Sequence, residues 1–136
     1  MKLKFFLPAI AASAMFIQPA TAEEHTALGE QMELMNDAYK AFRREEDPVK
    51  GAALSREAQD AMIKAISELP ETVIAMPDGP EKSKASAEYR VMMGQLISTL
   101  ASIELAFIEG DMAKVKETID IMRESKKTGH DQFVEE

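Results

Sequence analysis

The stretch EYRVMMGQLISTLASIELAFIEGDMAKVKETIDIMRESKKTGHDQF, residues 88–133, decides the fold of this chain. It contains two runs in which apolar residues return every three or four positions, which is the spacing of an amphipathic helix. Gly110-Asp111 lies between the runs and is typical of a tight turn. The sequence therefore predicts two helices, over about 81–109 and 112–134, that pack as antiparallel neighbours. Their apolar stripes are Tyr89, Met92, Met93, Leu96, Leu100, Ile103 and Phe107, and then Met112, Val115, Ile119, Met122, Lys126, His130 and Phe133.

The preceding half of the chain predicts a second helical pair. One helix is expected over about 24–44 and another from Asp47-Pro48, an N-cap followed by a first-turn proline, to Pro70. The segment PETVIAMPDGP, residues 70–80, contains three prolines and cannot form a continuous helix, but its apolar residues indicate that it packs on the bundle. No stretch alternates as a strand would. We predict an all-α protein, an antiparallel up-down-up-down four-helix bundle. The stripes of this half are Leu28, Met32, Met35, Tyr39 and Phe42, and then Ala52, Leu54, Ala58, Met62, Ile66 and Leu69.

The first 22 residues predict a cleaved signal peptide, with a short basic start, an apolar stretch and Ala20-Thr21-Ala22 as the cleavage site. Residues 23–136 then form one domain, which we place in a bacterial periplasm. The chain has 24 acidic and 16 basic residues and a formal charge of −8, so nucleic acid is not an expected partner. We expect no membrane insertion. There is no cysteine, so packing must stabilise the domain without disulfides.

Two potential metal ligands lie on these apolar stripes. His130 is in the last predicted helix, and Met32 is near the start of the first. In an antiparallel four-helix bundle both positions belong to the same end of the molecule, although the helix lengths alone do not bring them together. An imidazole and a thioether that face each other across an apolar core suit a haem iron.

Three segments resemble the cytochrome b562 family of soluble periplasmic haem proteins. Met32-Glu33-Leu34-Met35-Asn36-Asp37 is similar to the motif that carries the family's axial methionine. Glu88-Tyr89-Arg90 looks like an acidic-aromatic-arginine segment of its third helix, and the spacing from Gly110 to His130 resembles the run to its axial histidine. The resemblance covers essentially all of residues 23–136 and is weakest in the second helix and the proline-rich segment.

This resemblance implies one haem b with Met32 and His130 as axial ligands. Lys126-Lys127-Thr128-Gly129-His130 has no cysteines for thioether bonds, so the haem is expected to be non-covalent. Lys126 occupies the place of a basic residue near the haem propionates. The implied function is single-electron transfer to an unknown periplasmic redox partner by a monomer that is not an enzyme. The porphyrin is expected to lie among Leu28, Met35, Leu96 and Phe133.

Other interpretations of the same residues remain open. Met35 and His25 are rival ligands, and His130 could instead face solvent at a frayed helix end. Lys126 could be an ordinary surface lysine, and Gly129 weakens the helix beside His130 by roughly 0.5–1 kcal/mol relative to alanine. For the whole protein, the alternative is a haem-free helical periplasmic protein with a binding or chaperone-like role, since eight methionines of residues 23–136 would suit an adaptable surface.

Overall fold

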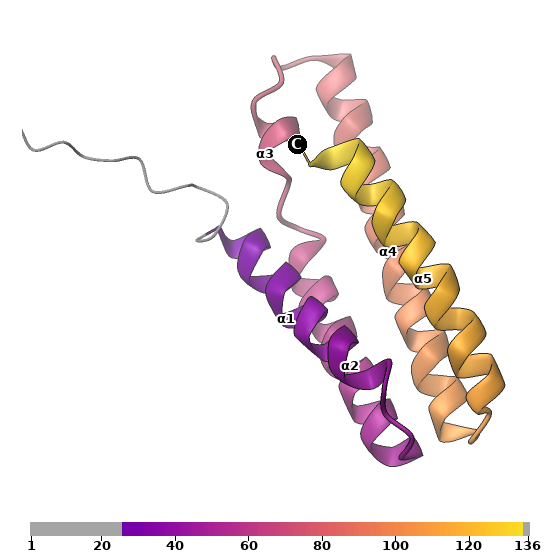
Figure 1. Cartoon of the computed structure of the whole chain (residues 1–136). Coiled ribbons are helices and arrows are strands. Elements are labelled where there is room, and N and C mark those ends of the chain that lie inside the picture. The colour runs from indigo at the N-terminus through magenta and orange to yellow at the C-terminus, as the bar shows by residue number, and fades with distance from the viewer. Residues whose placement is uncertain (1–25, 135–136) are drawn as a thin grey trace, which may run out of the picture.

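The computed structural model describes residues 26–134 of the chain. Within this range the chain is helical and contains no strand, so the predicted all-α class is confirmed. The predicted signal peptide (residues 1–22) and His25 lie outside the described residues. The helices, shown in Figure 1, are α1 (Ala27–Phe42), α2 (Pro48–Ala65), α3 (Glu71–Ile74), α4 (Pro80–Ile108) and α5 (Met112–Phe133).

Capping residues set the helix starts. Asp47 accepts hydrogen bonds from the backbone N–H groups of Val49 and Lys50, which confirms the predicted N-cap of α2. Asp111 accepts from the N–H of Lys114 at 3.0 Å and caps α5 directly after Gly110, whose φ of 70° gives the chain its turn. The first helix starts at Ala27, because Thr26 provides its cap, and α2 already ends at Ala65. The first two helices are therefore shorter than the sequence pattern predicts.

The segment between Pro70 and Pro80 forms the short helix α3, which the sequence analysis did not predict. Its Val73 is 2 % exposed and belongs to the core, so the expectation that this segment packs on the bundle is confirmed. Ile74, by contrast, is 57 % exposed. A four-residue helix turns its side chains in all directions, so one apolar residue packs inward and its neighbour faces outward.

The four long helices pack side by side. Helix α1 packs against α2, α2 against α4, and α4 against α5, so that α1–α2 and α4–α5 form two pairs (Figure 1). This arrangement is consistent with a four-helix bundle. The predicted stripe of α4 is buried except for half-buried Met92, whereas Met112 is 38 % exposed, because the first turn of α5 extends past the core. The largest fully buried apolar side chains are Tyr89, Phe42, Phe107, Met62, Met93, Leu100, Ile103 and Met122.

The α2–α4 interface contains polar contacts that the sequence pattern did not reveal. Ser55 is fully buried, and its hydroxyl donates to the carbonyl of Gly51 at 2.8 Å. Gln59, 6 % exposed, donates from its side-chain amide to the carboxylate of Glu104 on α4. Both buried groups are hydrogen-bonded and so carry no large desolvation cost, and the Gln59–Glu104 bond joins the two helices, whereas that of Ser55 stays within α2.

Helix α4 is long and apolar enough to cross a membrane by length and composition, with a mean hydropathy of 1.6 over its most apolar window. It is the one such helix among residues 26–134. Of this window, 33 % is buried inside the structure. Leu100, Ile103 and Phe107 of α4 are fully buried, whereas Val91, Leu105 and Ile108 of the same helix are 60 %, 54 % and 66 % exposed. Packing in the core therefore accounts for part of the apolar composition of α4.

Candidate functional site

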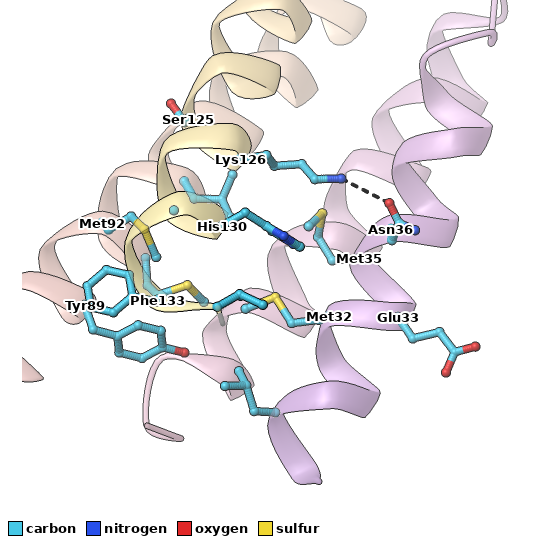
Figure 2. Close-up of a pocket in the computed structure, with 15 residues that line it drawn as sticks. Met32, Glu33, Met35, Asn36, Tyr89, Met92, Ser125, Lys126, His130 and Phe133 are labelled. Atoms are coloured by element: carbon cyan, nitrogen blue, oxygen red, sulfur yellow. Dashed lines mark hydrogen bonds between the residues drawn. The ribbon is translucent and has the colours of Figure 1, made fainter. Parts of the chain in front are cut away.

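A cavity of about 540 Å³ lies between α1, α4 and α5. This volume is within the roughly 300–1,000 Å³ of cofactor and small-molecule sites. Its walls are mainly apolar, and the four residues predicted to surround a porphyrin all line it. Figure 2 shows the side chains that surround this space. The lining is Leu28, Met32, Glu33, Met35, Asn36, Tyr89, Met92, Met93, Leu96, Ser125, Lys126, Gly129, His130, Phe133 and Val134.

Both predicted axial ligands line this cavity from different helices. His130 lies in the last turn of α5 and extends toward α1, where Met32 and Met35 point back into the same space (Figure 2). Met32 is half-buried, Met35 is 3 % exposed, and His130 is exposed at the cavity mouth. The structure thus brings together Met32 and His130, which the helix lengths alone could not. It places Met35 in the same cavity, so both methionines remain candidate ligands.

Lys126 connects α5 to α1 at the rim of the cavity. Its ammonium group donates to the side-chain oxygen of Asn36 at 3.0 Å (Figure 2) and lies 4.8 Å from the centre of the Tyr39 ring. Burial lowers the pKa of Lys126, and the nearby charges of Lys40 and Arg43 lower it further. Lys126 is therefore a half-buried cation held at the cavity edge, rather than a freely solvated lysine.

A second cavity of about 430 Å³ adjoins the first and shares Lys126 and His130 with it. Its lining is Tyr39, Arg123, Lys126, Lys127 and His130, and contains no carboxylate. Lys126 was predicted to lie near the haem propionates, whereas neither Lys127 nor Arg123 had a predicted role. The spacing 123, 126, 127, 130 places these side chains on one face of a helix, which was the available signal. We call this cavity the cationic cleft; its charge is suited to carboxylates.

Tyr89 and Phe133 form a fixed wall of the larger cavity. Their rings meet edge to face at 5.6 Å, and the Tyr89 hydroxyl donates to the carbonyl of Ala65 at 3.0 Å. Burial, with a smaller contribution from Glu68, raises the pKa of Tyr89 to about 12. The carbonyl of Phe133 accepts from the Thr72 hydroxyl at 2.9 Å, which ties the end of α5 to the α3 segment. Tyr89, which the sequence places on the apolar stripe of α4, is thus buried and also lines the cavity.

Gly129 allows α4 and α5 to approach closely beside His130. A Cβ atom at this position would lie 2.6 Å from the sulfur of Met92, well inside van der Waals contact. The glycine that weakens the last turns of α5 thus leaves room for the Met92 side chain, which would have to turn aside if a larger residue replaced it. Met92 and Met93 at this wall were predicted only as core residues, and Asn36 had no predicted role.

The donor atoms of the cavity fit a haem better than a bare divalent metal ion. Within residues 26–134 no group of three or more His, Cys, Asp or Glu side chains is placed to hold a metal. One imidazole and one thioether on different walls suit a metal that brings its remaining ligands with it. The apolar lining matches a porphyrin face, and the cationic cleft matches propionates. Fold and cavity together fit the class of helical proteins that bind a cofactor between their helices.

Comparison with known families agrees with this class. The family model described as cytochrome b562 matches residues 27–133, nearly all of the described chain, and the protein belongs to this family. Its members are helical, haem-binding electron carriers that are generally not enzymes. Neither the curated proteins nor the solved structures gave a match.

Proposed function

We propose that this protein carries single electrons in the periplasm through one non-covalent haem b, with Met32 and His130 as axial ligands. The observation that carries this proposal is that Met32 on α1 and His130 on α5 line one apolar cavity. When bound, the haem supplies an iron centre that exchanges single electrons. Met32 and His130 together would leave a bound haem iron no free position for substrate, so we propose electron transfer rather than enzymatic turnover.

The two proposed ligands have different effects on the redox equilibrium. A neutral His130 imidazole binds iron in both oxidation states, whereas the soft thioether of Met32 favours the ferrous state. The pair therefore raises the reduction potential relative to two histidines. Neither ligand carries a charge. The surrounding apolar side chains, such as Leu96 and Phe133, exclude water and raise the potential further.

Lys126 is proposed to hold a haem propionate. Its ammonium group is already at the rim of the cavity, where Asn36 fixes its position. In this proposal a propionate joins or replaces Asn36 as the partner of Lys126. A lysine offers a point charge rather than the bidentate contact of arginine, so it fixes the propionate less rigidly.

The topology and location are part of the same proposal. The connection over residues 43–47 spans at most about 17 Å, whereas α1, with 16 residues, is about 24 Å long. Such a short connection favours an antiparallel pair, and the same argument applies to α4 and α5, hence an up-down-up-down order. Residues 1–22 would direct export, which N-terminal sequencing of the mature protein would test.

Haemin titration of purified variants tests the ligand assignment. His130→Ala should lose most haem binding while retaining its helical circular dichroism. Thr128→Ala, an exposed residue of the same helix, is the matched control and should bind haem normally. If His130→Ala bound haem with the wild-type spectrum and affinity, the proposed ligation would be wrong. A folded wild-type chain that ignored haemin would instead support the haem-free binding or chaperone-like alternative.

A further inference from the structure

The larger cavity contains more soft donor atoms than a haem needs. Four methionines line it, two from α1 and two from α4, together with His130 from α5. The proposed function uses one thioether and one imidazole. Three thioethers at the same cavity therefore have no role in haem ligation. The four methionines are Met32, Met35, Met92 and Met93.

Three of these donors converge on one part of the cavity. Met32 and Met35 are three residues apart on α1 and therefore lie on one face of that helix. Figure 2 shows both side chains pointing into the space toward which His130 extends from α5. Met35 is 3 % exposed, so its sulfur is shielded from bulk water. Methionine has three rotatable bonds, so small rotamer changes can bring its sulfur to a shared ligand.

The chemistry of these donors selects a particular kind of metal ion. Thioether sulfur is soft and neutral and favours Cu(I), while imidazole also binds copper well. Harder divalent ions favour carboxylates, and Glu33, which is exposed, is the one carboxylate among the described lining residues. The half-buried Lys126 at the rim adds a positive charge that penalises a divalent ion more than a monovalent one.

We propose that, in the absence of haem, this cavity binds one Cu(I) ion through His130 and the thioethers of Met32 and Met35. Met92 and Met93 form the adjacent soft wall. This inference goes beyond the proposed function and does not depend on it. Because His130 and Met32 are shared, copper and haem exclude each other at this cavity.

The alternative explanation is that the four methionines only fill the interior, as methionines in helical bundles often do. That explanation predicts no affinity for Cu(I) above that of any exposed methionine. It also predicts that volume-conserving Met→Leu substitutions change only stability, and by less than about 1.5 kcal/mol. The two explanations therefore differ in a metal-binding measurement.

The test uses the full-length mature chain without haem, under anaerobic reducing conditions. Cu(I) is titrated in competition with the chelator bathocuproine disulfonate, and the methionine methyl groups are followed by ¹³C NMR. We expect one bound equivalent, with methyl shifts at Met32 and Met35, smaller shifts at Met92 and Met93, and none at the exposed Met112. Met35→Leu should weaken Cu(I) binding by about tenfold or more, while Met112→Leu should leave it unchanged.

Three results would overturn the copper site. They are complete loss of copper to the chelator in the wild-type chain, equal shifts at all methionines, and equal affinities of the Met35→Leu and Met112→Leu variants. If Met35→Leu failed to fold, the wild-type methyl shifts would decide alone. Haem binding is tested by haemin titration of a separate sample. Because a chain that does not bind Cu(I) still gives the haem spectrum if the proposed function is right, the two proposals fail independently.

Discussion

The contact between Gly129 and Met92 predicts that one substitution changes sign with its background. Gly129→Ala removes a flexible glycine from a helix, which by itself stabilises the fold by roughly 0.5–1 kcal/mol. In the wild-type chain, however, the new Cβ would lie 2.6 Å from the Met92 sulfur. The Met92 sulfur lies near the end of a flexible side chain that can turn aside, so relieving the overlap is expected to cost about 1 kcal/mol, at the low end for an overpacked core. We therefore expect Gly129→Ala to destabilise the wild-type protein by about 0–0.5 kcal/mol.

In a Met92→Ala background the sulfur is absent and the overlap disappears. The same Gly129→Ala substitution should then stabilise the protein by roughly 0.5–1 kcal/mol. The four proteins form a double-mutant cycle whose interaction energy is expected at about 1 kcal/mol. Urea unfolding followed by circular dichroism gives the four free energies of unfolding. Gly129→Ala should also weaken haem binding, because the displaced Met92 moves into the cavity.

One result would refute this reasoning. If Gly129→Ala stabilised both backgrounds equally, by the helix-propensity term alone, the contact between Gly129 and the Met92 side chain would not constrain the packing of α4 on α5. The glycine would then need another explanation, and the shape of the cavity wall next to His130 would have to be revised.

Three further predictions concern the buried Tyr89 hydroxyl, the methionine ligand of the haem and the cationic cleft. Tyr89→Phe removes the hydrogen bond from the Tyr89 hydroxyl to the carbonyl of Ala65, which still accepts from the N–H of Glu68, and should cost about 0.5–1.5 kcal/mol of unfolding free energy. The pKa of Tyr89 rises from 10.0 to about 12 on folding. The stability that the protonated Tyr89 hydroxyl adds to the fold is therefore fully present below pH 10 and is lost as the pH rises toward 12. Alkaline unfolding should therefore begin above pH 10, and a Tyr89→Phe variant should lack this component. Met32→Ala should give the haem-loaded protein a higher-spin spectrum and a lower potential than wild type, whereas Met35→Ala should keep the low-spin spectrum; the reverse pattern would make Met35 the ligand. Lys127→Glu, in the cationic cleft, should slow the oxidation of the reduced haem protein by the anionic oxidant ferricyanide more than Lys116→Glu does. Equal slowing by the two variants would show that ferricyanide does not approach the haem through the cleft.

Much of the fold followed from periodicity and turn residues. The stripe of α4 and the Asp47-Pro48 start of α2 were predicted correctly, because burial on one helix face and capping both leave local signals. The helix α3 was missed, since three prolines in eleven residues conceal a single helical turn that depends on the core contact of Val73. The burial of Ser55 was also missed, because a hydroxyl bonded to its own helix carries no apolar signal.

The cavity was predictable only in part. Met32 and His130 could be proposed as ligands from their residue types and their places on two stripes. Whether Met32 and His130 line the same cavity depends on where each helix begins and ends, and the periodicity of the sequence does not define these ends. The half-buried position of Lys126 arises from Asn36 and Tyr39, residues far away in sequence. The cationic cleft likewise forms only when α1 and α5 face each other.

The visible spectrum of the periplasmically expressed protein tests the central claim most directly. It is recorded before and after dithionite, with a pyridine haemochrome assay on the same sample. The proposal of a haem b held by Met32 and His130 predicts sharp low-spin α and β bands on reduction and the haemochrome of haem b. A folded protein that is colourless, and remains so when haemin is added, would contradict it.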